Sequence, residues 1–155
     1  MLKKGFSFSI GLGFLLITLA AQPVLSHIQA RQEVSLPNPT EEVPVLKSAG
    51  KKNPLPDGSY FIWEFNQTPK MGTIILKLAV HDQTGDKVNH LQIYGRSDMP
   101  SMRGHHDSGE VAFKVNNQGA YLLPVNIVMP GDWEVILTFK QGENILYRGR
   151  ILFKV

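Results

Sequence analysis

The residues best suited to chemistry lie in one short segment, residues 98–107. Beyond the first residue the chain has four methionines and five histidines, and four of these nine fall within residues 99–106. Pro100 and Gly104 interrupt the segment, which predicts a loop and neither a strand nor a core helix. Thioether sulfur and imidazole nitrogen are soft and borderline ligands that favour copper, Cu(I) above all, over zinc or magnesium. The segment therefore predicts a copper site.

Five residues are candidate metal ligands: Met99, Met102, His105, His106 and Met129. Met99 and Met102 are three residues apart around a proline, so a turn would aim both sulfurs at a point near the two histidines. His106 or Met129 would complete the site. Met129 precedes a Pro-Gly-Asp turn, and a methionine packed at a strand end is the simpler interpretation of that residue.

Two other interpretations of the loop stay open. Its methionines can fold back as a hydrophobic plug, because methionine fills irregular gaps, or the loop can be a contact surface for another protein. His81 and His90 fall on polar strand faces and are interpreted as surface residues. Nothing in the sequence orders a Ser-His-acid relay or forms a phosphate-binding or metalloprotease motif, so we predict no enzyme.

Composition excludes several classes of protein. The 155 residues contain no cysteine, which excludes a disulfide scaffold, a thiolate zinc site, an iron–sulfur centre and a blue-copper site. The net charge is +3, and two of those charges are Lys3 and Lys4, so residues 5–155 carry 14 basic against 13 acidic side chains. This balance does not predict nucleic-acid binding.

The N-terminal part predicts export. Residues 1–26 combine a basic start with an uncharged apolar run, the layout of a signal peptide, and residues 5–25 are also long enough for a retained membrane anchor. Residues 27–57 hold five of the ten prolines among polar residues, which predicts a flexible tether. We expect a periplasmic or other extracytoplasmic protein, either cleaved or membrane-associated.

Residues 58–155 are predicted to form one all-β domain. Alternating apolar and polar residues indicate strands over 60–65, 73–81, 88–94, 111–115, 121–128, 133–139 and 145–155. About seven short strands with Gly- and Asn-rich turns are typical of an immunoglobulin-like antiparallel β-sandwich. Gly119 and Tyr121 have the spacing of a tyrosine corner, and Pro124 predicts a sheet edge or a bulge. The predicted inward residues are Ile74, Leu76, Leu78, Val80, Leu91, Ile93, Val111, Phe113, Val115, Tyr121, Trp133, Val135, Leu137 and Phe139.

Three motifs in order, Met99-Pro100-x-Met102-x-Gly104-His105, Gly119-x-Tyr121 and Met129-Pro130-Gly131-Asp132-Trp133, resemble the YtkA-like domain, which is related to the FixH family. The likeness covers about residues 58–150. It implies an immunoglobulin-like sandwich in an exported or membrane-tethered module beside copper handling or oxidase assembly. Carried onto this sequence, it implies Met99, Met102 and His105 as ligands, with His106 immediately after them.

The expected function is therefore an exported, non-enzymatic module that binds copper, as Cu(I), or hands it over through the Met/His loop. The expected partner is a membrane protein or a copper-handling protein. The alternative is a metal-free interaction module that serves a membrane protein or transporter.

Overall fold

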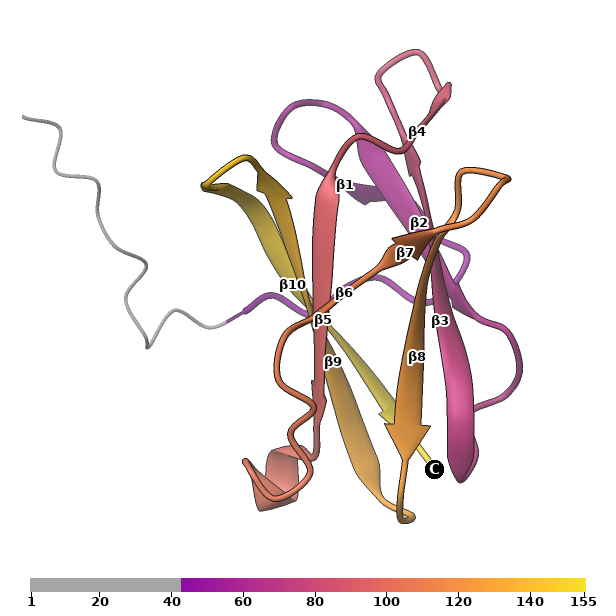
Figure 1. The fold of residues 1–155 in the computed structure, drawn as a ribbon, viewed down its shortest axis with the longest axis vertical. Coiled ribbons are helices and arrows are strands. Elements are labelled where there is room, and N and C mark those ends of the chain that lie inside the picture. Colours follow the sequence, from indigo (N-terminus) through magenta and orange to yellow (C-terminus); the bar gives the residue numbers. More distant parts are fainter. Residues whose placement is uncertain (1–42) are drawn as a thin grey trace, which may run out of the picture. The chain divides into compact units, whose positions relative to one another are not determined.

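The computed structural model describes residues 43–155 as two antiparallel sheets packed face to face (Figure 1). The predicted signal or anchor and the tether up to residue 42 lie outside the described residues. The first sheet has the order β1-β2-β3-β8-β7, with β4 also paired to β3. The second sheet has the order β10-β9-β5-β6. The all-β sandwich predicted from the sequence is confirmed.

Six strands have six or more residues and four have two. The strands of the first sheet are β1 (Asn53–Pro54), β2 (Tyr60–Phe65), β3 (Gly72–His81), β4 (Lys87–Val88), β7 (Lys114–Val115) and β8 (Tyr121–Ile127). Those of the second are β5 (Gln92–Asp98), β6 (Val111–Ala112), β9 (Asp132–Gln141) and β10 (Asn144–Lys154). A single 3-10 turn, η1 (Pro100–Met102), follows β5 within residues 43–155.

The core lies between the sheets and contains most of the predicted inward residues. Twelve of the fourteen are buried, and the exceptions are Val111 and Val115, with 41% and 43% of their surface exposed. The prediction for these two is wrong because the chain changes sheets between them. β6 pairs with β5, and β7 pairs with β8. Only Phe113, at the crossing point, is buried.

Two local predictions are confirmed. The Tyr121 hydroxyl donates to the carbonyl of Leu91 and accepts from its N–H, both at 3.1 Å, as a tyrosine corner would. Pro124 pairs with Ile75 of β3 on one side, whereas β7 reaches only Tyr121 and Leu122 on the other side of β8. At Pro124, β8 is therefore a sheet edge, where a residue without an N–H is tolerated.

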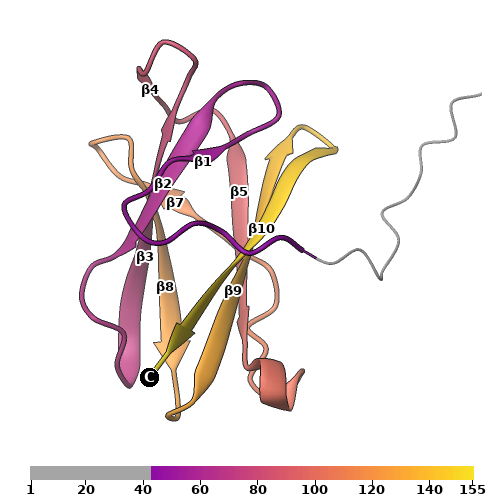
Figure 2. The same cartoon turned by 180° about the vertical axis from the view of Figure 1, so that it is seen from behind.

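The domain begins before residue 58, contrary to the predicted tether boundary. The N–H of Leu46 donates to the carbonyl of Arg150 at 2.9 Å, and the N–H of Arg150 donates to the carbonyl of Pro44 at 2.8 Å. This segment meets β10 in one isolated bridge between Val45 and Arg150, and Figure 2 shows it passing across that strand. A Cβ on Gly149 would lie 2.4 Å from the Leu46 side chain, so the glycine permits this close approach. Leu46 and Leu55 both belong to the hydrophobic core.

No helix within residues 43–155 is long and apolar enough to cross a membrane.

Candidate functional site

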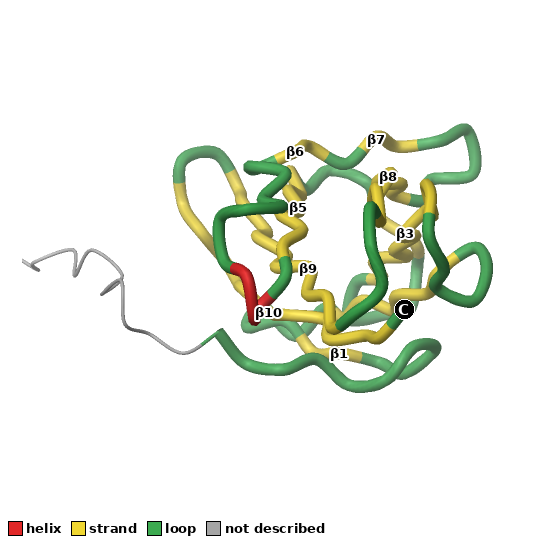
Figure 3. Tube along the Cα trace, turned by 90° about the horizontal axis from the view of Figure 1, so that it is seen from below, coloured by secondary structure: helices red, strands yellow, loops and turns green. Residues whose placement is uncertain are grey.

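The Met/His loop, residues 99–110, connects β5 to β6 at one end of the sandwich. η1 marks this end in Figure 1, and Figure 3 views the molecule from it. Pro100 starts η1, where a missing N–H costs nothing. Two turns follow each other, because the N–H of Met102 donates to the carbonyl of Met99 and that of His105 to the carbonyl of Met102, both at 3.0 Å. The loop is therefore ordered by its own backbone.

The far end of the loop is fixed to β5. Arg96 donates to both carboxylate oxygens of Asp107, with its Nε 2.7 Å from Oδ1. This hydrogen-bonded pair lowers the pKa of Asp107 and raises that of Arg96. The N–H of Ser108 also donates to the carbonyl of Ser97 at 2.9 Å, and the Ser108 hydroxyl accepts from the N–H of Ser97. The loop thus begins and ends on the same strand.

The two methionines of the loop have different environments. Met99 is 3% exposed and belongs to the core, and its methyl group would lie 2.8 Å from a Cβ placed on Gly131. Met102 is 38% exposed. The plug interpretation thus describes Met99, whereas Met102 is exposed to solvent.

The histidines also differ from each other. His105 is exposed, and His106 is half-buried with its ring centroid 6.2 Å from that of Trp133. Met129, which is half-buried and packed against the core, accepts a 3.1 Å hydrogen bond at its carbonyl from the Trp133 indole N–H. Trp133 therefore links His106 to the turn that contains Met129. The sequence assigned Trp133 to the core alone and did not predict this link.

Nitrogen and oxygen ligands do not form a metal site by themselves here. Within the part of the chain that the structure describes, no three His, Asp or Glu side chains gather as a metal ion would require. Two other histidines were predicted to be surface residues. His81 stacks on Tyr60 with 5.0 Å between ring centroids, and His90 is exposed. Both lie at the end of the sandwich opposite the Met/His loop.

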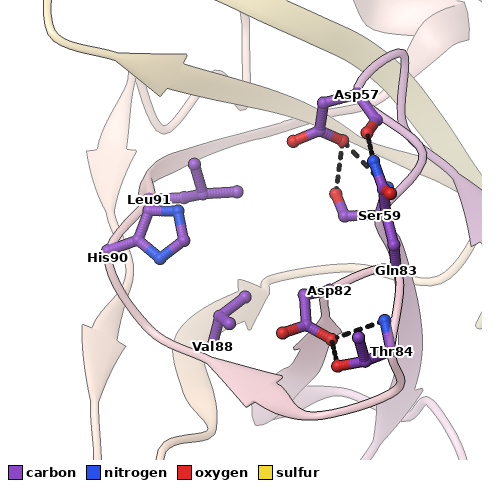
Figure 4. Close-up of a pocket in the computed structure, with 8 residues that line it drawn as sticks. All are labelled: Asp57, Ser59, Asp82, Gln83, Thr84, Val88, His90 and Leu91. Carbon is purple, nitrogen blue, oxygen red and sulfur yellow. Dashed lines mark hydrogen bonds between the residues drawn. The ribbon is translucent and has the colours of Figure 1, made fainter.

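That opposite end has a hollow of about 280 Å³, which the sequence did not indicate (Figure 4). Asp57 and Asp82 line it, and each carboxylate accepts hydrogen bonds from the turn that follows it. The bonds from Ser59 and Thr84 lower the pKa values of the two aspartates. These carboxylates stabilise turns, and the hollow gives no second candidate site.

Comparison with known proteins gives one match to a family model and a weak fold likeness. The family model described as YtkA-like matches residues 64–138. No curated protein matches the chain. The crystal structure of as-isolated FetP from uropathogenic Escherichia coli strain F11, expressed in the E. coli periplasm, is 14% identical, with a TM-score of 0.47 over 69% of this chain and 93% of that one.

A copper-bound variant of the same FetP is 15% identical, with a TM-score of 0.46 over 68% of this chain and 94% of that one. Similarities this low do not assign a function to the chain.

Proposed function

Since this chain contains a YtkA-like domain, we propose that it is an exported, non-enzymatic β-sandwich module that binds Cu(I) and hands it over through the Met/His loop. One observation carries the proposal: an ordered loop presents an exposed thioether, Met102, and an exposed imidazole, His105, at the two ends of one hydrogen-bonded turn. An exposed methionine gains little from packing, which makes its sulfur available as a ligand.

The proposed ligands are Met102 and His105, completed by His106. Thioether and neutral imidazoles carry no charge, and such a set suits a soft monovalent ion better than Zn²⁺ or Mg²⁺. Met99 and Met129 are not ligands in this proposal. Met99 is buried in the core, and Met129 is half-buried against it. The resemblance to the YtkA-like domain, which implies modules beside copper handling, supports the same conclusion.

Exposure of the ligands supports transfer rather than permanent storage. A partner protein can approach Met102 and His105 from solvent and exchange ligands with the bound ion. Copper also competes with protons for the imidazoles, since a histidine must be neutral to bind. We therefore expect Cu(I) affinity to weaken as the pH falls. A copper titration at several pH values checks this, and an affinity unchanged down to pH 5 would argue against histidine ligands.

Competition titration with a chromophoric Cu(I) chelator tests the proposed function on the full chain. Met102→Leu keeps volume and apolarity while removing the sulfur, and His105→Ala removes an imidazole. We expect both variants to lose Cu(I) affinity without a change in unfolding temperature. Met71→Leu and His90→Ala are matched controls, because Met71 is more exposed than Met102 and His90 is also exposed. Parental affinity in both loop variants would overturn the proposal.

The proposal includes the compartment and the partner. Residues 1–26 would direct export, either as a cleaved signal or with residues 5–25 kept as an anchor, and the partner would be a membrane or copper-handling protein. Cell fractionation followed by N-terminal sequencing tests this part. Recovery of the chain in the cytoplasm with its N-terminus intact would contradict it.

A further inference from the structure

Two carboxylates lie buried directly beneath the Met/His loop. Asp98, the last residue of β5, pairs across the strands with Glu134 of β9. Both side chains point to the outer face of the second sheet, because the alternate residues Ser97 and Val135 pair on the inner face. Their exposed fractions are nevertheless only 6% and 1%. Acidic side chains are almost never this buried unless they are paired, so their partners are informative.

The partners of Asp98 are the two ends of the turn that contains Met102. One carboxylate oxygen accepts from the N–H of Met99 at 2.8 Å, and the other accepts from the N–H of Gly104 at 2.9 Å. Each oxygen of a single side chain thus fixes one end of residues 99–104. A charged acceptor makes both hydrogen bonds stronger than bonds between neutral groups.

The partner of Glu134 is Arg103, which lies between Met102 and Gly104. Arg103 Nη1 donates to Glu134 Oε1 at 2.8 Å, and the arginine side chain is 59% exposed whereas that of the glutamate is 1% exposed. The other oxygen, Oε2, is buried and accepts no hydrogen bond from residues 43–155. Glu134 also lines a small hollow of about 140 Å³, together with Asp98 and Gly104.

Stability alone gives little reason to keep this pair, in which the glutamate is buried and the arginine is exposed. Removing a carboxylate from water costs so much that well-packed apolar residues often stabilise a protein as well or better. What the pair does supply is position: it ties the residue that follows Met102 to a rigid strand. The two carboxylates together therefore hold three points of the turn, at residues 99, 103 and 104.

We propose that Asp98 and Glu134 are positioning residues of the Met/His loop. These two carboxylates hold Met102 and His105 at the separation that one ion requires. The inference rests on the proposed function. Residues that orient metal ligands through hydrogen bonds, without touching the metal, typically contribute about 10- to 100-fold to metal affinity. Neither carboxylate is a ligand in this proposal, since the oxygens of Asp98 are engaged with backbone N–H groups and Glu134 is covered by Arg103.

The test separates positioning from stability with a double substitution in the full chain. Arg103→Leu with Glu134→Leu removes both charges, so no unpaired charge stays buried, and the unfolding temperature is expected to stay level or rise. Cu(I) affinity is expected to fall about 10-fold or more. Hydrogen exchange of the backbone amides of residues 102–106, measured without copper, is expected to become faster. Arg103→Lys keeps one donor for Glu134 and is expected to preserve both properties.

Parental exchange and parental copper affinity in the double variant would overturn the positioning role. A lower affinity accompanied by a large loss of unfolding temperature would also overturn it, because the pair would then be structural. The exchange measurement needs no metal. If the parent protein itself binds no Cu(I), the proposed function fails, and the exchange rates still decide whether the pair holds the loop.

Discussion

At the scale of single residues, the chain separates two methionines that look equivalent in the sequence. Met99 and Met102 flank the same proline turn, yet one belongs to the core and the other is exposed. Residue type and spacing identified the loop as chemically unusual, but the burial of Met99 involves its contact with Gly131, which forms only in the folded chain. No local pattern carries that information.

Met99→Leu should therefore behave differently from Met102→Leu. Exchanging methionine for leucine conserves volume and apolarity, so Met99→Leu is expected to cost less than about 1.5 kcal/mol of unfolding free energy. It should leave Cu(I) affinity unchanged, because the proposed site does not use this sulfur. Urea unfolding and the same copper titration check the two properties. A loss of copper affinity in Met99→Leu would assign Met99 to the site.

A second prediction at this scale concerns the hydroxyl group of Tyr121. Tyr121→Phe removes the only hydroxyl that bonds both backbone groups of Leu91 within residues 43–155. Leaving buried polar groups unsatisfied costs about 1–3 kcal/mol each, so urea denaturation should show a loss of at least that order. An unchanged midpoint would show that water replaces the hydroxyl without cost.

The raised pKa of Tyr121 predicts that the folded state loses stability at alkaline pH. Burial raises its pKa, since the charged tyrosinate is poorly solvated in the core. The folded state therefore holds this proton more tightly than the unfolded state does. The stabilisation is complete below about pH 10, the pKa of an unfolded tyrosine, and is lost as the pH rises through the folded value. Tyr147, whose pKa burial also raises, adds to the effect. Unfolding temperatures from pH 8 to 11 check it, and a flat profile would contradict it.

At the scale of elements, periodicity predicted the long strands and failed at the short ones. Alternation shows that a segment has one buried face, but it does not show which sheet that face belongs to. Residues 111–115 alternate perfectly and still divide between two sheets, so Val111 and Val115 are exposed. The proline-rich segment before residue 58 has no periodicity, yet Leu46 and Leu55 enter the core. Their backbone N–H groups donate to Arg150 of β10 and to Ser59, just before β2.

A truncation tests that packed segment. A chain that starts at residue 43 should be more stable than one that starts at residue 58, because the shorter chain exposes the surface that Leu46 and Leu55 cover. Burying each leucine contributes roughly 1.5–3 kcal/mol, so the difference should be several kcal/mol in urea unfolding. Equal stabilities would restore the view of residues 43–57 as a tether.

At the scale of the whole molecule, one residue, Trp133, connects the core with the Met/His loop. Its indole is 1% exposed in the core, contacts His106 and donates to the carbonyl of Met129. The sandwich, its inward residues and the loop were predictable because each follows from local period or composition. The hydrogen bonds to Asp98 and Glu134 were not, since they depend on the register of two strands that are far apart in the sequence.

Trp133→Ala should destabilise the domain by roughly 3–5 kcal/mol, the usual cost of truncating a buried aromatic side chain. Trp133→Phe keeps most of the packing and loses only the N–H that bonds Met129, so it should cost less. Chemical unfolding followed by circular dichroism ranks the two variants against the parent. Equal stability of all three would mean that the sheets do not depend on this side chain.

X-ray absorption at the copper K-edge of the Cu(I)-loaded protein tests the central claim most directly, because it identifies the atoms bound to the metal. The parent protein should show sulfur scattering together with the nitrogen scattering of imidazole. Met102→Leu should lose the sulfur contribution, whereas Met99→Leu should keep it. A parent spectrum without sulfur, or sulfur that persists in Met102→Leu, would contradict a copper site built on this loop.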